Sequence, residues 1–390
     1  MTALAQDTRP RSGEVPAGPG ARRPRVLIAP VTITPTKPLT PSHLKGLLWT
    51  DVMFRATGML ADVTYRCSHT TYHPCEQTVG FWEYLDRTLG DTDYAGRSEA
   101  DIGELYVRYR AGGQRPTFAA CRPYLDAIEL HGWVHPASAR VLDLWSAHYA
   151  RLGLHDPGLT EHQPPAMTLD ELIDRLCAVD LAVDLREHGG PVYLDATRYG
   201  MPLRQIVAAD GRPNYLACAL RELVPMAGGY DEIVLLYDRE LEPDYLLLQR
   251  VLSRFGDTVR RVGIGRVPID GRILSARHGA WRDHCAGDLL DALSARHSAE
   301  AIRLGMRLYF IAMLGPGAEA SFRGHLLDRW LRRAERLLSA TTGPTSADLA
   351  ALLARHRGEH AYVDPYRLTS SLLGRHGREP VRDLLTAVFT

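Results

Sequence analysis

The chain has 390 residues, and its 45% hydrophobic and 24% charged residues are typical of a folded globular protein rather than a disordered one. Its 46 Lys and Arg residues balance its 46 Asp and Glu residues, so its net charge does not attract it to DNA. A local basic groove is still compatible with this balance. No apolar run reaches about 18 residues, so we expect no membrane span. Six cysteines without a Cys-x-x-Cys pair fit a reducing cytoplasm, which is the expected location.

The start of the chain predicts a strand, a stiff turn and a helix. Residues 1–24, rich in Ala, Gly, Pro and Arg, are expected to be a disordered leader. Residues 25–33 are apolar and β-branched and predict a buried strand, which prolines end. The prolines of residues 34–39 stiffen the turn, after which Thr40 caps a helix that has Pro41 at its first position. A short strand at 61–65 and helices near 76–89, 100–111, 117–130 and 136–151 follow.

Strands and helices then alternate, which predicts an α/β fold with a parallel sheet. No strand is expected beyond about residue 298, where helices run to the end. We therefore expect a leader (1–24), an α/β unit (25–297) with a helical insertion at about 98–165, and a helical C-terminal domain (298–390). The elements predicted after residue 167 are a helix, strands at 179–185 and 191–195, a turn, a helix at 213–224, a strand at 232–237, a helix at 243–255 and a strand at 259–264.

The first strand, turn and helix form the default site of such a fold. Ligands of an open parallel sheet bind beyond the carboxyl ends of its strands, at helix N-termini. The helix that starts near Ser42 and His43 offers free backbone N–H groups and a positive dipole end, which can stabilise a carbonyl oxygen that becomes negative. Topology alone thus predicts an α/β enzyme of unknown chemistry.

Residues 34–46, Thr-Pro-Thr-Lys-Pro-Leu-Thr-Pro-Ser-His-Leu-Lys-Gly, resemble the first signature of the arginyl branch of the class I aminoacyl-tRNA synthetases. Order and spacing hold over roughly 270 residues, which short motifs alone would not give. The resemblance implies a Rossmann-like sheet of the class I synthetase type, with a C-terminal helical domain too short for a full anticodon domain and no N-terminal tRNA-elbow domain. Further similar segments are residues 77–80, 151–161, 210–216, 230–234 and 271–279, the last in the place of the second signature loop.

Several residues depart from the signatures, and those at the nucleotide imply that ATP chemistry is weakened. The first His of the family's signature is Thr40, and the Gly that lets adenine lie against the backbone is Ser42. A side chain at that place crowds a nucleotide, because only Gly permits such close approach. The leading Lys of the second loop is Ile273, the Asn of the first signature, which resembles an amino-acid ligand, is Thr34, and the Asp four residues after Tyr215 is Ala219.

A chain that no longer activates its substrate needs one that is already activated, and aminoacyl-tRNA is such a substrate. Cyclodipeptide synthases are class I synthetase relatives that work in this way, without ATP. The resemblance therefore implies an aminoacyltransferase of natural-product biosynthesis that joins arginine, from arginyl-tRNA, to a second aminoacyl group as a diketopiperazine. Aminoacyl-tRNAs are the expected partners, and no cofactor is expected.

The resemblance also implies the roles of particular residues. Ser42 is expected to accept the arginyl group unless the second amine attacks directly, and His43 is expected to act as a modest base. Lys37 and Thr40 stand beside them in the signature. The expected substrate-binding residues are Thr34, Gln77, Glu161, Tyr215 and Glu240, with Glu161 and Glu240 as acceptors for a guanidinium. The expected tRNA or phosphate contacts are Lys45, Arg272, Ser275 and Arg277.

Two further patterns have less specific interpretations. Cys67, His69, His73 and Cys75 have metal-ligating side chains, but their spacing matches no common structural zinc site, so we predict no metal. Arg329, Trp330 and the following arginines form a basic helix face, which is either solvated or a tRNA backbone contact.

Two alternatives belong to other classes. An ATP- and Mg-dependent ligase would form an aminoacyl adenylate and pass it to a small amine. A non-catalytic protein would use a synthetase-like pocket to sense an amino acid or tRNA. The second amino acid, a covalent aminoacyl-enzyme and the oligomeric state stay open at this stage.

Overall fold

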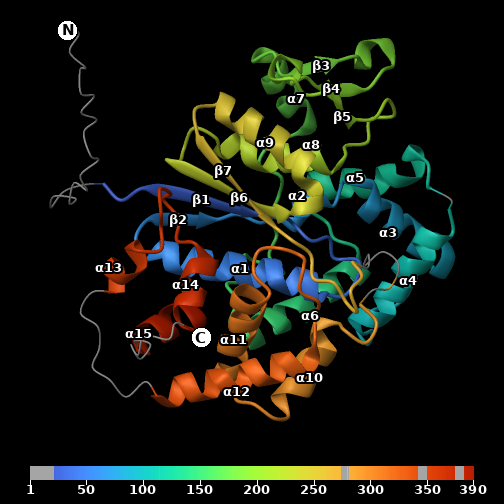
Figure 1. Ribbon diagram of the computed structural model, residues 1–390. Coiled ribbons are helices and arrows are strands. Elements are labelled where there is room, and N and C mark those ends of the chain that lie inside the picture. The colour runs from blue at the N-terminus through green and yellow to red at the C-terminus, as the bar shows by residue number, and fades with distance from the viewer. Residues whose placement is uncertain (1–21, 114, 274–278, 280, 341–348, 374–381) are drawn as a thin grey trace, which may run out of the picture.

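A four-stranded parallel sheet lies at the centre of the chain (Figure 1). The computed structural model describes residues 22–113, 115–273, 279, 281–340, 349–373 and 382–390. The strand order is β2-β1-β6-β7. The strands are β1 (Arg25–Pro30), β2 (Asp62–Tyr65), β6 (Glu232–Asp238) and β7 (Thr258–Ile264).

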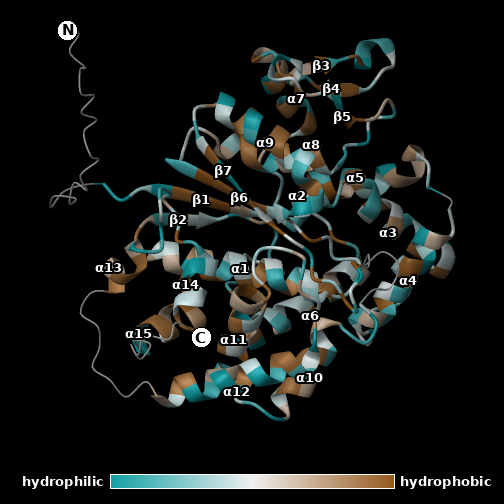
Figure 2. Cartoon of the chain, in the orientation of Figure 1, coloured by the Kyte–Doolittle hydropathy of each residue, from teal (hydrophilic) through white to brown (hydrophobic). Residues whose placement is uncertain are grey.

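Both faces of this sheet are buried, because side chains alternate between two hydrophobic cores. Val26 and Ile28 of β1 face the core that contains α1 (Pro41–Gly58). Leu27 and Ala29 face the core that contains α8 (Tyr215–Leu223) and α9 (Glu242–Arg254). The central strands are accordingly among the most hydrophobic parts of the ribbon in Figure 2. The predicted parallel α/β sheet is confirmed.

Helices extend the core on the α1 side and lie within a few residues of their predicted bounds. α3 begins with Glu76, and the stacked and edge-packed aromatic rings of this region, such as Trp82 against His135, fill the space between the helices. None of the helices in the described parts of the chain is long and apolar enough to cross a membrane. The helices are α2 (His69–Tyr72), α3 (Glu76–Leu89), α4 (Glu99–Ala111), α5 (Phe118–His131) and α6 (Pro136–Leu152).

The strands expected at 179–185 and 191–195 do not join the parallel sheet, which corrects that prediction. They form β3 (Ala182–Asp184) and β4 (Val192–Leu194), and with β5 (Arg204–Val207) they make a separate antiparallel sheet. This sheet and α7 (Leu169–Ala178) lie beyond α8 and α9 (Figure 1). No α-helix separates β3 from β4 or β4 from β5 in this fully described stretch, and such short connections suit antiparallel rather than parallel pairing.

The C-terminal helices pack against α1 and α6, and no strand element follows residue 298 in the described ranges. Arg307 of α11 is fully buried, and its Nη2 donates to Asp51 of α1 at 2.5 Å. This pair joins the helical segment to the helix that covers the sheet. The helices are α10 (Ala286–Ser294), α11 (Ala299–Arg307), α12 (Gly324–Ala340), α13 (Leu349–Ala354), α14 (Pro365–Ser371) and α15 (Arg382–Leu384).

Candidate functional site

The sheet reverses its strand order between β1 and β6, and ligands of open α/β sheets bind at that place. Beyond its last residue, β1 stays beside β6, because the backbone N–H of Val31 donates to the carbonyl of Leu236 at 2.7 Å. The turn that follows leads to the start of α1, which has 18 residues and no acidic residue in its first turn. The positive end of the α1 dipole is therefore not neutralised by its own first turn.

The turn before α1 is fixed by contacts with three other helices. Gln77 Nε2 of α3 donates to Thr34 Oγ1 at 3.1 Å, and Ser138 Oγ of α6 donates to the carbonyl of Pro35 at 2.8 Å. Gly103 of α4 has no side chain where Pro38 passes, and a Cβ there would lie 2.6 Å from the proline ring. Thr34 and Gln77, which the sequence assigned to one pocket, are thus in direct contact.

Lys37 lies within this fixed turn and is only 8% exposed. Its Nζ lies 5.3 Å from the centre of the Tyr106 ring, a cation–π distance. The positive charge of Lys37 is therefore held inside the site rather than in solvent.

Thr40 and His43 cap the start of α1 reciprocally. The backbone N–H of His43 donates to Thr40 Oγ1 at 3.4 Å, and the backbone N–H of Thr40 donates to His43 Nδ1 at 3.1 Å. Since Nδ1 accepts, the proton of the neutral ring is on Nε2. Burial, with the nearby cations Lys37 and Arg266, lowers the pKa of His43 to about 3. The ring is thus a neutral donor, and the role of base expected for His43 does not fit this geometry.

Ser42 connects the start of α1 to the segment after β7. Its Oγ accepts a hydrogen bond from the backbone N–H of Val267 at 3.0 Å. The Ser42 side chain thus binds a backbone donor of a segment that is distant in sequence.

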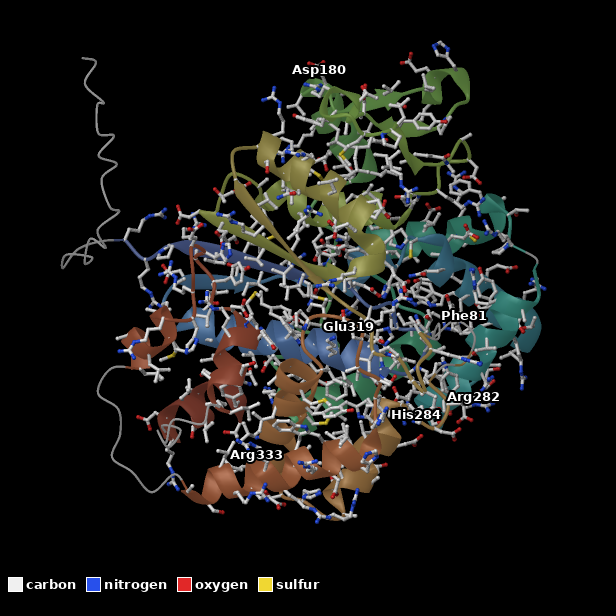
Figure 3. All side chains as sticks on the ribbon, viewed as in Figure 1. Phe81, Asp180, Arg282, His284, Glu319 and Arg333 are labelled. Carbon is white, nitrogen blue, oxygen red and sulfur yellow. The ribbon has the colours of Figure 1, made fainter. Side chains whose placement is uncertain are left out.

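Lys45, expected to contact a phosphate, is instead buried. It is 1% exposed, and its Nζ donates to the carbonyl of Gly317 at 2.6 Å. Burial and the charge of Arg239 lower the pKa of Lys45 to about 8, while Glu319, labelled in Figure 3, raises it. Because the side chain points into the protein, it cannot reach an external phosphate, and the sequence-based role of Lys45 is wrong.

The turn that accepts from Lys45 also lies against the segment after β7. The backbone N–H of Gly265 donates to the carbonyl of Pro316 at 2.8 Å, and a Cβ on Gly265 would lie 2.5 Å from the backbone of Gly317. Glycine at position 265 therefore permits an approach that no other residue allows. Through this contact the C-terminal helical segment supports the backbone that carries Val267.

A pair of carboxylates lies at the carboxyl end of β6 and is bound by a resident arginine. Nε of Arg266 pairs with Asp238, and its Nη1 lies 2.7 Å from Glu240 Oε2. Glu240, expected to accept a substrate guanidinium, thus already has a guanidinium partner within the chain. Lys37 is a further cation near His43, while Lys45, further along α1, is influenced by both Arg239 and the carboxylate of Glu319.

Tyr215 contacts the end of β1 from the other side. The backbone N–H of Thr32 donates to its hydroxyl at 3.1 Å, and the hydroxyl lies 3.2 Å from the Thr32 carbonyl. Its ring lies 4.8 Å from that of Tyr72, and its hydroxyl also bonds Tyr245. Burial raises the pKa of Tyr215 well above its usual value, so the hydroxyl stays protonated.

A buried carboxylate behind these tyrosines was not found from the sequence. Glu222 is 2% exposed; it accepts from the backbone N–H of Ser68 at 2.7 Å and pairs with Arg66 at 3.1 Å. Burial raises its pKa to about 7, against the opposing effect of Arg66. Glutamates on helices are usually solvated, so only the tertiary contacts of Glu222 on α8 identify it.

Two further sequence-predicted residues, Glu161 and Arg272, are exposed. Glu161 is exposed on the loop after α6, and a Cβ on Gly158 would lie 2.9 Å from its Oε2. Arg272 is exposed and closes a tight turn with Ile269. Ser275 and Arg277, like residues 1–21 of the expected leader, lie outside the described residues.

The four metal-ligating side chains between β2 and α3 have other partners or neighbours. Cys67 Sγ lies 3.5 Å from Thr32 Oγ1, and Cys75 Sγ lies 3.7 Å from Thr78 Oγ1. His69 and His73 have ring centres 5.7 Å apart, and both are buried. Within the described ranges no group of His, Cys, Asp and Glu is arranged to hold a metal ion.

The sequence matches no known protein family, and it matches no curated protein. Solved structures are similar to it. Arginyl-tRNA synthetase from Thermus thermophilus superposes with a TM-score of 0.63 at 15% identity, over 95% of this chain and 75% of that one. The chain has the fold of a class I aminoacyl-tRNA synthetase. This synthetase-like fold confirms the Rossmann-like class expected from the sequence.

Two further structures share the likeness more weakly. A putative arginyl-tRNA synthetase from Campylobacter jejuni has a TM-score of 0.47 at 14% identity, over 73% of this chain and 63% of that one. Methionyl-tRNA synthetase from Mycobacterium tuberculosis, solved with methionyl-adenylate, has a TM-score of 0.47 at 12% identity, over 94% of this chain and 81% of that one. At 15% identity, the likeness to the Thermus thermophilus structure shows the synthetase-like fold alone.

Proposed function

We propose that the chain transfers an aminoacyl group from aminoacyl-tRNA to an amine without using ATP, as a cyclodipeptide synthase for which arginyl-tRNA is one substrate. The observation that carries this proposal is the hydrogen bond from Val267 N–H to Ser42 Oγ. We infer that this bond excludes a nucleotide from the place that the family resemblance gives it, while polar side chains suited to an amino acid, Thr34, Gln77 and Tyr215, stay near the end of β1. A site of this kind suits a substrate that arrives already activated.

The chemistry follows from the groups at the start of α1. The α-amine of one aminoacyl-tRNA, whose pKa is about 8, attacks the ester carbonyl of the other. The carbonyl oxygen becomes negative and is stabilised by the helix N-terminus and by the Nε2–H of His43. The C–O bond to the tRNA then breaks, the 3′ oxygen leaves and takes a proton, and a dipeptidyl-tRNA remains. Its free amine attacks the second ester in the same way and closes the diketopiperazine ring.

Direct attack by the amine is favoured over an acyl-serine. Ser42 Oγ already accepts from Val267, and His43, its neighbour, presents a protonated nitrogen rather than a base. A serine without an adjacent base is a weak nucleophile. Ser42 therefore acts here as a structural bridge, and the leaving tRNA is displaced in a single transfer at each ester.

The basic face of α12 supplies a surface for the tRNA backbone. Arg332 pairs with Asp328 at 2.8 Å, and Arg333 lies 5.9 Å from the centre of the Trp330 ring. Arg329 and Arg336 are exposed on the same helix. A local basic row of this kind can contact phosphates even when the whole chain is neutral.

The decisive experiment mixes the purified chain with preformed arginyl-tRNA and a pool of other aminoacyl-tRNAs, after removal of ATP, and analyses the products by mass spectrometry. An arginine-containing cyclic dipeptide supports the proposal and identifies the second residue. His43→Ala, which removes the Nε2–H donor, should slow product formation at least tenfold, whereas His188→Ala, at an exposed histidine between β3 and β4, should not. ATP–pyrophosphate exchange with an amino acid and no cyclic product would favour the ligase. If neither assay gave a product, a non-catalytic protein that senses an amino acid or tRNA would be favoured.

A further inference from the structure

Arg266 lies inside the candidate site rather than on a remote surface. It follows β7 closely, it precedes Val267, which binds Ser42, and its charge contributes to the lowered pKa of His43. Its side chain reaches back to the carboxyl end of β6, where it pairs with Asp238 and Glu240. The guanidinium of Arg266 thus contacts both carboxylates and is close enough to His43 to influence its charge.

The two carboxylates are arranged as a receptor for a guanidinium. Nε and Nη1 of Arg266 face different carboxylates, so one planar cation satisfies both. The side chains of Asp238, Arg266 and Glu240 are 22%, 27% and 51% exposed, so solvent and solutes can reach the group. An exposed ion pair of this kind is weak enough for a competing guanidinium to replace it.

Competition depends on how each guanidinium is delivered. Arg266 is part of the chain, so its effective concentration at the carboxylates is in the millimolar range or above. Free arginine at lower concentration loses this competition. An arginyl group attached to tRNA binds together with the tRNA. The binding energy of the tRNA contacts can therefore offset the cost of displacing Arg266 from the carboxylates.

We propose that Asp238 and Glu240 form the receptor for the substrate's arginine side chain, and that Arg266 occupies it in the free chain so that tRNA-borne arginine enters while free arginine is excluded. This inference rests on the proposed function and makes Arg266 a specificity-determining residue. When the substrate binds, Arg266 is displaced towards the ester, where its charge can face the developing oxyanion.

Calorimetric titration of the full chain with L-argininamide tests the receptor without requiring turnover. Arg266→Ala should bind the amide at least tenfold more tightly than the unsubstituted chain. L-citrullinamide, a neutral analogue of similar shape, should gain nothing, because it cannot form the ion pair. Adding Glu240→Gln to Arg266→Ala should remove most of the gain. Equal affinities of the unsubstituted chain and Arg266→Ala, or an equal gain for L-citrullinamide, would overturn the proposal.

Arg261→Ala is the matched control. Arg261 lies on β7 and also pairs with a carboxylate, that of Glu242, but outside the group around Arg266. Arg261→Ala should leave the affinity for L-argininamide unchanged. A gain in affinity as large as that of Arg266→Ala would mean that the loss of any cation has this effect, and it would contradict the proposal. Arg266→Gln, which keeps the length and polarity of the side chain, should give the same gain as Arg266→Ala if folding of the alanine variant is impaired.

The transfer reaction separates this inference from the proposed function. If cyclic dipeptide forms, free arginine should inhibit Arg266→Ala at a concentration at least tenfold lower than it inhibits the unsubstituted chain. Equal inhibition would reject the gating by Arg266 while the proposed function stands. If no transfer occurs under any condition but the titration shows the gain, the proposed function fails and the guanidinium receptor stands.

Discussion

The Oγ of Ser42 accepts a hydrogen bond from the backbone N–H of Val267, 225 residues further along the chain, at 3.0 Å. The bond joins the start of α1 to the segment after β7 and gives the Val267 N–H a partner. Glycine at position 42 would remove both the side chain and this hydrogen bond.

Ser42→Gly should reopen this part of the site. Removing the hydroxymethyl group frees the Val267 N–H and the space against α1, so ATP should bind at least tenfold more tightly than to the unsubstituted chain. Equilibrium dialysis with labelled ATP measures the change. Ser68→Gly, at a buried serine near β2, serves as control and should change nothing. Equal ATP binding before and after Ser42→Gly would show that the side chain does not block the nucleotide.

The lowered pKa of His43 gives the stability of the chain a pH dependence. The pKa is about 3 in the folded chain, against 6.5 for an ordinary histidine, so the unfolded chain takes up a proton first as the pH falls. The contribution is complete above pH 6.5 and is lost as the pH falls towards 3. His43→Gln, which can accept and donate similarly, should flatten this part of the profile, by an amount on the order of 3 kcal/mol.

Urea unfolding at about pH 7 and about pH 4.5, on either side of the ordinary pKa of histidine, measures that difference. The free energy of unfolding should fall less between the two pH values in His43→Gln than in the unsubstituted chain. Other buried histidines, His69 and His73 among them, titrate in both proteins and cancel in the comparison. Identical pH dependence in the two proteins would mean that His43 is protonated normally in the fold.

Both lysines of the sequence, Lys37 and Lys45, should resist amine-directed reagents in the native chain. They are 8% and 1% exposed, and Lys45 Nζ is bonded to Gly317. Acetylation with a water-soluble ester, followed by peptide mass spectrometry, should proceed at least 100-fold more slowly at both positions than in urea. If Lys45 reacted in the native chain as fast as it does in urea, its side chain would have to be exposed rather than buried.

Gly265→Ala should destabilise the chain and reduce transfer. The added methyl group would lie 2.5 Å from the Gly317 backbone, so either the turn or the segment carrying Val267 must move. We expect the free energy of unfolding to fall by about 2–4 kcal/mol. Gly46→Ala is the control, because a Cβ there meets nothing within 4 Å and alanine favours a helix. Thermal unfolding of both variants tests this prediction. An unchanged melting temperature for Gly265→Ala would show that Gly265 does not lie against the Gly317 backbone.

The strand–turn–helix at the start could be predicted because its signals are local. Prolines, β-branched residues and the capping pair Thr40 and His43 determine the backbone without reference to distant segments. The resemblance named Thr34 and Gln77 as substrate-binding residues, and the hydrogen bond between them is a finding of the structure. Ser275 and Arg277 remain predictions.

The contacts that changed the predicted roles are distant in sequence and could not be inferred locally. Nothing near Lys45 in the sequence indicates a bond to Gly317, and nothing near Glu240 indicates that Arg266 binds it. The antiparallel pairing of β3 and β4 was missed because an apolar run alone does not specify the direction of its partner. Glu222 was missed because a glutamate on a helix is usually solvated.

The contact of Gly265 with the turn at Gly317 bears on how this chain could have been assembled. The α/β unit and the C-terminal helices meet where the backbones of Gly265 and Gly317 are in contact. The buried ion pair of Asp51 and Arg307 and the hydrogen bond from Lys45 to Gly317 add to this interface. Separating the two parts would take Arg307 away from Asp51 and the Gly317 carbonyl away from Lys45 Nζ, and the Asp51 and Lys45 side chains are both buried. The helical segment is therefore no interchangeable module, and recombination that exchanges it for another would have to replace both sides of the interface together.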